Sequence, residues 1–101
     1  MNTSNKSTLE AMYEIEFSNR YKKSYTQAVK RGLDVKLLND VVMQLAEGKK
    51  LDKKHKDHGL EGNYKGYREC HIQFDWLLVY RIVRKRCVLY LLDTGTHEEI
   101  F

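Results

Sequence analysis

Apolar and polar residues alternate along two stretches of the chain at the two-residue period of a β-strand. Apolar side chains alternate with glutamates over residues 12–17. Over residues 67–74, the even-numbered positions share one side, and Tyr67, Glu69 and His71 share the other. Each stretch therefore predicts a strand with one side facing the protein interior.

Between these stretches the apolar residues recur at helical spacing. Ser18 or Asn19 can cap a helix that runs to about Arg31. Asp34 can cap a second helix, which Gly48 ends. The apolar positions are Tyr21, Tyr25, Ala28 and Val29 in the first helix, and Leu37, Leu38, Val41, Val42 and Leu45 in the second.

The last part of the chain predicts a pair of antiparallel strands. Residues 76–83 are apolar on both sides, as in a central strand, and residues 83–86 read as a tight turn. Residues 87–92 form the partner strand, which residues 94–96 break. Residues 49–64 are polar, contain glycine and lack a period, so they predict a loop.

These elements predict one domain with the order β-α-α-β-β-β. A chain of 101 residues has the size of a single domain. We expect residues 1–10 to form a flexible N-terminal extension and residues 11–101 to form the domain. The expected fold class is α+β, with two helices packed on one face of a mainly antiparallel sheet.

Basic residues are clustered along the chain. The net charge is +4, and residues 20–36 carry six basic residues and one acidic residue. Residues 49–58 carry five basic and two acidic residues. Clustered Lys and Arg suit binding to nucleic acid, because they displace its counterions. An ordinary solvated surface accounts for the same charges equally well.

Hydropathy and the polar N-terminus predict a cytoplasmic protein. The longest nearly apolar run, residues 76–80, is far shorter than the ~20 residues that cross a bilayer. The polar first residues do not resemble an export signal, so no membrane partner is expected. Cys70 and Cys87 do not form a CxxC pair, and we expect two reduced thiols.

The histidines are the candidate chemistry of the chain. His71 lies on the side of its strand away from the core, His55 and His58 lie in the lysine-rich loop, and His97 lies in the tail. Histidine transfers protons near neutral pH, which suits RNA cleavage by attack of the ribose 2′-OH on its own phosphodiester. We expect no cofactor and no metal. Zinc bound by His55, His58 and Cys70 is a competing interpretation that lacks a fourth spaced ligand, and surface histidines without a catalytic role are another.

Several motifs occur together in the second half of the chain. They are Lys56-Asp-His-Gly-Leu60, Gly62-Asn-Tyr-Lys-Gly-Tyr-Arg68, Cys70-His71, Asp75-Trp76 with Val79-Tyr80, and Thr94-Gly-Thr-His-Glu-Glu-Ile-Phe101. In this combination the chain resembles the RelE/ParE superfamily of bacterial toxins, and within it the YafQ branch. The resemblance implies a RelE-like fold and a small endoribonuclease that cuts mRNA in the ribosomal A site.

The resemblance also implies roles for individual residues. His58, His71, Asp75 and His97 would share the proton transfers and orient the 2′-OH. In this interpretation His97 is the general acid, and Asp75 or His71 is the base. The residues expected to contact the substrate are Trp76, Phe101, Arg68, Arg81, Arg86 and Lys56.

Two of these assignments carry alternatives. Trp76 could equally be a packing residue that fixes Asp75. Asp93 stands where relatives often carry an arginine immediately before the TGTH segment. Either another cation (Arg68, Arg81 or Arg86) replaces that charge, or the activity is reduced.

The partners implied by the resemblance are a cognate antitoxin of the DinJ/RelB type, in a toxin–antitoxin heterotetramer, and the 70S ribosome with its mRNA. Two other functions stay open. A ParE-like toxin that poisons DNA gyrase would share the fold, although such chains generally lack histidines at positions 58 and 97. A non-catalytic RNA-binding module would account for the charge alone.

Overall fold

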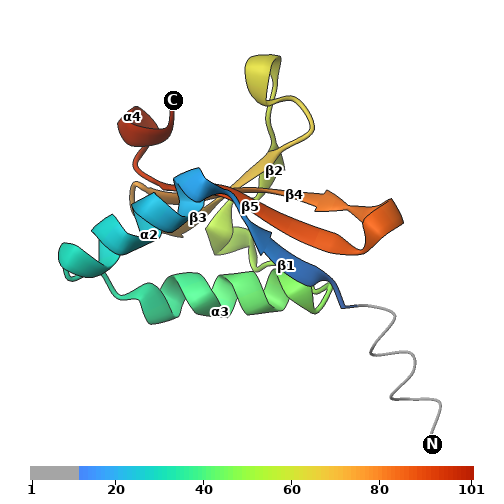
Figure 1. The fold of residues 1–101 in the computed structure, drawn as a ribbon, viewed down its shortest axis with the longest axis horizontal. Coiled ribbons are helices and arrows are strands. Elements are labelled where there is room, and N and C mark those ends of the chain that lie inside the picture. Colours follow the sequence, from blue (N-terminus) through green and yellow to red (C-terminus); the bar gives the residue numbers. More distant parts are fainter. Residues whose placement is uncertain (1–11) are drawn as a thin grey trace, which may run out of the picture.

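The computed structural model describes residues 12–101, so the expected extension at residues 1–10 lies outside the described residues. A five-stranded sheet with the order β1-β5-β4-β3-β2 forms its centre (Figure 1). Strand β1 pairs in parallel with β5, and the other neighbours are antiparallel. The strands are β1 (Glu14–Phe17), β2 (His58–Gly59), β3 (Arg68–Gln73), β4 (Trp76–Val83) and β5 (Val88–Gly95), and the helices are α2 (Asn19–Lys30), α3 (Val35–Ala46) and α4 (His97–Ile100).

The two long helices begin at the caps that the sequence predicts. The side chain of Ser18 accepts a hydrogen bond from the backbone N–H of Tyr21, and that of Asp34 accepts one from Lys36. Each cap satisfies an N–H group that has no partner within its helix. Gly48, with φ at 75°, follows the end of α3 in a conformation that favours glycine.

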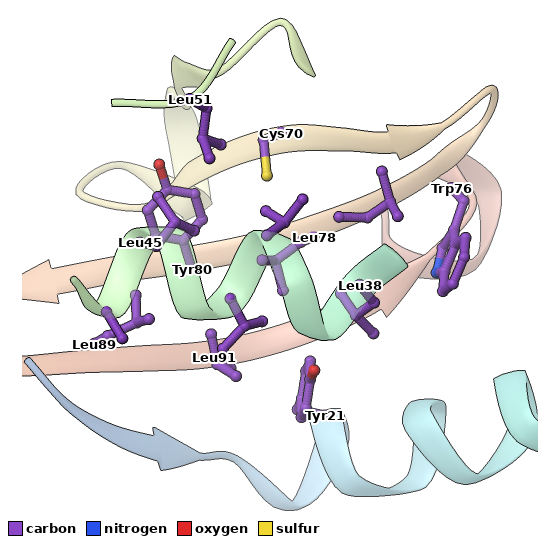
Figure 2. Close-up of a cluster of buried hydrophobic side chains, with 14 of the residues drawn as sticks. Tyr21, Leu38, Leu45, Leu51, Cys70, Trp76, Leu78, Tyr80, Leu89 and Leu91 are labelled. Carbon is purple, nitrogen blue, oxygen red and sulfur yellow. The ribbon is translucent and has the colours of Figure 1, made fainter. Parts of the chain in front are cut away.

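The main core lies between the two long helices and one face of the sheet (Figure 2). Tyr21 of α2 and Leu38 of α3 pack there with Leu78 of β4 and Leu91 of β5. The three leucines have no exposed surface, and burying each stabilises the fold by ~1.5–3 kcal/mol. The prediction of two helices on one face of a mainly antiparallel sheet is confirmed.

The other face of the sheet carries a smaller apolar cluster, which Leu77, Val79 and Ile100 of α4 form. Because side chains alternate along a strand, β3 sends Cys70 into the main core and Glu69 to this second face. In Figure 1, α4 and the segment between β2 and β3 both lie on the side of the sheet opposite α3. Glu69 and His71 of β3 therefore lie on the face of the sheet opposite the main core.

The short elements differ from the prediction. The expected loop at residues 49–64 contains β2 and two 3₁₀ turns, Lys53–His55 and Gly62–Tyr64. Strand β5 continues to Gly95, because its last residues still pair with the start of β4. The tail forms α4, which begins with a reciprocal pair of hydrogen bonds between Thr96 and Glu99. Strand β2 and helix α4 each span only about one period of their pattern, so periodicity alone does not reveal them.

Phe74 does not share the core side of β3 but is 91% exposed in the turn before β4. Cys70 is buried and Cys87 exposed, and both are free thiols. Within residues 12–101, no helix is long and apolar enough to cross a membrane.

Candidate active site

The site centres on Glu69, a carboxylate that the sequence pattern did not single out. Its side chain is only 5% exposed and lies among three imidazoles. The distance from its Oε2 to Nε2 is 3.1 Å for His58, 3.6 Å for His97 and 3.8 Å for His71. Three predicted catalytic residues, from β2, α4 and β3, therefore converge on one buried acid.

Strand pairing explains this convergence. His58 lies directly opposite Glu69 in the β2–β3 ladder. His71 follows Glu69 by two residues and so lies on the same face of β3. The two-residue spacing of Glu69 and His71 was visible in the sequence, whereas a two-residue strand leaves no pattern that could have revealed the position of His58.

Asp75 joins the cluster through His97. Its Oδ1 accepts hydrogen bonds from the ring Nδ1 of His97 at 2.7 Å and from the backbone N–H of the same residue at 3.2 Å. These bonds hold the pKa of the Asp75 carboxyl below its usual range. Asp75 is therefore ionised at neutral pH, and it orients the imidazole so that Nε2 faces Glu69.

The second ring nitrogens of the other two histidines face backbone oxygens. Nδ1 of His58 lies 3.0 Å from the carbonyl oxygen of Gly59, and Nδ1 of His71 lies 3.2 Å from that of Phe74. Carbonyl and carboxylate oxygens only accept hydrogen bonds. His58 therefore makes both of its bonds only when both ring nitrogens carry a proton, and such a group can serve acid–base chemistry.

Phe101 brings an aromatic ring to the edge of the cluster. Its ring centroid lies 6.3 Å from that of His97 and 4.8 Å from that of Tyr64, and the rings of Phe101 and Tyr64 are nearly perpendicular. Phe101 is 52% exposed, so its ring is open to a substrate. An exposed aromatic side chain beside imidazoles can stack on an unpaired nucleobase.

Trp76 lies in the main core instead. It is 6% exposed, and its indole N–H donates to the hydroxyl of Thr94 at 3.0 Å. A buried indole has no free face for a base. Its position favours the packing alternative, in which Trp76 fixes the neighbouring Asp75 at the start of β4.

Two of the expected substrate cations lie away from the three imidazoles. Arg68 pairs with Asp57 at 3.3 Å and leaves β3 on the side opposite Glu69. Lys56 lines a cavity of about 520 Å³ that also reaches His71. Leu37 and Val41 of α3 line the same cavity, and Glu69, His58 and His97 do not, so Lys56, like Arg68, lies away from the imidazole cluster.

Arg81 and Arg86 form a separate basic patch on the sheet. The guanidinium of Arg81 lies 5.5 Å from the ring centroid of Tyr67, and Arg86 pairs with Glu16 at 3.1 Å. Both arginines line a cavity of about 300 Å³ together with Tyr67 and Tyr90. The patch lies on the same face of the sheet as the imidazoles. Its Tyr67 packs against the apolar cluster that includes Ile100 of α4, and this cluster lies on that face.

The position of Asp93 was the main departure from the resemblance. Its side chain is almost completely buried and accepts hydrogen bonds from Nε of Arg20 at 2.9 Å, from the hydroxyl of Ser24 and from the backbone of Thr94. The cation beside Asp93 is therefore Arg20 of α2. No local pattern could have found a contact between residues 73 positions apart.

The residues of the competing zinc interpretation do not converge. Nδ1 of His55 lies 2.6 Å from the backbone oxygen of His71, whereas Cys70 is buried in the main core. Among residues 12–101, no three His, Cys, Asp or Glu side chains are arranged to hold a metal ion.

Comparison with known proteins identifies relatives of the whole described chain. The sequence profile described as "Bacterial toxin of type II toxin-antitoxin system, YafQ" matches residues 13–101. The mRNA interferase toxin YafQ of Escherichia coli K12 is 37% identical over 89 residues, which cover 87% of this chain and 95% of that protein. A metal-bound toxin from Helicobacter pylori has a TM-score of 0.84 at 44% identity and covers 89% of this chain and 100% of its own. The E. coli DinJ-YafQ toxin-antitoxin complex gives a TM-score of 0.80 at 35% identity over 89% of this chain and 98% of that chain.

Proposed function

Because the chain belongs to the YafQ family of toxins from bacterial type II toxin–antitoxin systems, we propose that it is an mRNA interferase that cuts mRNA in the ribosomal A site. The observation that carries this proposal is the convergence of His58, His71 and His97 on Glu69. The name of the E. coli relative, mRNA interferase toxin YafQ, supports the same substrate.

The proposed reaction is a transesterification that needs no metal. The ribose 2′-oxygen attacks the phosphorus, and the bond to the 5′-oxygen of the next nucleotide breaks. A base removes the proton of the 2′-OH, and an acid protonates the departing 5′-oxygen. The upstream fragment then ends in a 2′,3′-cyclic phosphate, and the downstream fragment begins with a 5′-hydroxyl.

The contacts favour one division of the proton transfers. His97, oriented by Asp75, is the general acid in this proposal, and His71 is the base. Asp75 is the weaker candidate for the base, because its lowered pKa and its bonds to His97 leave it a poor proton acceptor near neutral pH. Glu69 would hold His58 in place and stabilise positive charge on the imidazoles.

We also propose a cognate antitoxin of the DinJ/RelB type as partner, in a heterotetramer, and the cytoplasm as location. The E. coli relative forms a DinJ-YafQ complex. The basic clusters of this chain suit an antitoxin whose toxin-wrapping segment is acidic, since complementary charge speeds and directs association.

The chemistry of the product ends tests the proposal. The toxin, freed from its antitoxin, is incubated with ribosomes translating a defined mRNA, and the fragment ends are mapped. We expect a 2′,3′-cyclic phosphate on the upstream fragment, and its loss in His97→Ala. Intact mRNA together with stabilised DNA breaks in a gyrase assay would favour a ParE-like toxin. Ribosome or RNA binding without any cyclic phosphate would favour the non-catalytic module.

A further inference from the structure

Helix α4 carries His97 and is followed by Phe101, yet it has only four residues. A helix of one turn is unstable alone, because nucleation costs more than its few hydrogen bonds return. Its position must therefore come from contacts with other elements. Ile100, which is 5% exposed, supplies an apolar contact, and a polar contact comes from α2.

Arg20 of α2 reaches the end of α4 across 80 sequence positions. Its Nη2 donates to the carbonyl oxygen of Ile100 at 2.9 Å and to the hydroxyl of Tyr64 at 3.3 Å. The Tyr64 hydroxyl lies 3.3 Å from the same carbonyl oxygen. One guanidinium therefore joins α2, the end of α4 and the ring that packs against Phe101.

Asp93 fixes the direction of this guanidinium. Its carboxylate is 5% exposed, and Nε of Arg20 lies 2.9 Å from it, whereas the Arg20 side chain is 43% exposed. Asp93 itself is held by Ser24 and by the backbone of Thr94. Burying a carboxylate without a charged partner lowers the stability of the fold. The Asp93–Arg20 pair is therefore firmly held, and Arg20 can anchor the end of α4.

We propose that Arg20, held by Asp93, is a positioning residue that sets helix α4, and through it His97 and Phe101, over Glu69. This inference rests on the proposed function, since it assigns Arg20 a part in the same cleavage reaction. Arg20 acts through α4 and need not touch the RNA. A displacement of His97 of about 1 Å would lower the cleavage rate by up to about a hundredfold.

The test compares Arg20→Gln with Lys23→Gln, which removes the same charge from an exposed position of the same helix. We expect Arg20→Gln to lower the single-turnover rate on programmed ribosomes by at least about tenfold. The toxin concentration for half-maximal rate should change by less than about threefold, and Lys23→Gln should change both quantities by less than about twofold. Equal effects of the two variants would overturn the inference, because charge loss alone would then explain them.

A second pair of variants keeps the test decisive if Arg20→Gln is poorly folded. Asp93→Asn preserves volume, and Arg20→Lys preserves charge but cannot bridge Asp93 and Ile100 in the same way. We expect both to lower the rate, to shift the pH at which His97 titrates by NMR, and to speed amide exchange over residues 97–101. The double variant should lose no more activity than the worse single variant. The inference would be overturned if the rate losses of the two single variants multiplied in the double variant. It would also be overturned if amide exchange over residues 97–101 and the titration of His97 stayed unchanged.

The NMR measurements also separate this inference from the proposed function. If the wild-type toxin did not cleave mRNA, the proposed function would fail. Even then, faster amide exchange at residues 97–101 in the Arg20 variants would show that Arg20 anchors α4.

Discussion

At the scale of single residues, Glu69 has the most contacts with the proposed catalytic groups. It is a buried acid with three imidazole Nε2 atoms within 4 Å. The substitution Glu69→Gln keeps the shape and one acceptor oxygen but removes the negative charge. We expect the single-turnover cleavage rate to fall by about a hundredfold, because the imidazoles lose a preorganised charge partner. Rapid-quench kinetics on programmed ribosomes measure this effect.

The control for Glu69→Gln is Glu61→Gln, which removes an exposed carboxylate between β2 and β3. We expect the control to keep the wild-type rate within about twofold, because an exposed charge is screened by solvent. Comparable losses in the two variants would mean that the buried acid has no specific part in the reaction.

Asp75 leads to a prediction about pH. Hydrogen bonds from His97 lower the pKa of its carboxyl in the folded protein. The stabilising contribution is therefore fully present above the unfolded value, ~3.9, and is lost as the pH falls through the lowered folded value. We expect the ¹³C signal of the Asp75 carboxyl to titrate at a lower pH than that of an ordinary aspartate. In His97→Gln the same signal should titrate nearer the ordinary value, and identical curves in the two proteins would contradict the assignment.

At the scale of elements, Gly95 ends strand β5 where the chain passes close to α4. Gly95 has φ at +154°, and a Cβ there would meet Oε1 of Glu99 at 2.9 Å. Glu99 closes the capping box with Thr96. We expect Gly95→Ala to displace Glu99, to cost about 1 kcal/mol of stability and to lower cleavage about tenfold by moving His97.

Gly32→Ala is the matched variant for that experiment. Gly32 lies after α2 and also has a positive φ. A Cβ added there would meet nothing within 4 Å. We expect this variant to lose a similar free energy of unfolding, measured in urea, while the cleavage rate stays unchanged. If both glycine variants slowed cleavage equally, general destabilisation would be the cause.

Elements with a repeated pattern are the ones that the sequence predicted. Helices α2 and α3 have 12 residues each, so their apolar stripes repeat over several turns. Strand β2 has two residues and α4 has four, and distant contacts decide both. The face that bears His71 followed from the strand period alone. Two contacts depend on the assembled sheet, namely the pairing of His58 with Glu69 and the hydrogen bond between Arg20 and Ile100. No local sequence pattern predicts them.

At the scale of the whole molecule, the sheet separates packing from chemistry. One face holds the main core with α2 and α3 (Figure 2), and the other holds Glu69, the three imidazoles and α4. The main core can therefore supply most of the stability while the second face stays open to a large substrate. Arg81 and Arg86 lie on that open face, beyond the imidazoles, where an RNA backbone or ribosomal RNA could extend.

We predict that Arg81 and Arg86 bind RNA and take no part in the proton transfers. The double variant Arg81→Gln/Arg86→Gln reduces the net charge from +4 to +2. We expect weaker binding to programmed ribosomes and a log–log salt slope that is shallower by about 1.4, or ~0.7 for each lost phosphate contact on single-stranded RNA. The single-turnover rate at saturating toxin should stay unchanged, because neither arginine contacts the Glu69 cluster.

The matched control is the double variant Lys36→Gln/Lys49→Gln. It removes the same two charges beside α3, where both lysines have exposed acidic partners. If the patch binds RNA locally, only the arginine variant changes the salt slope, since exposed charges more than a Debye length (~8 Å) from the RNA are screened. Equal slopes in the two double variants would instead mean that binding follows net charge, and that the patch beside the imidazoles has no specific role.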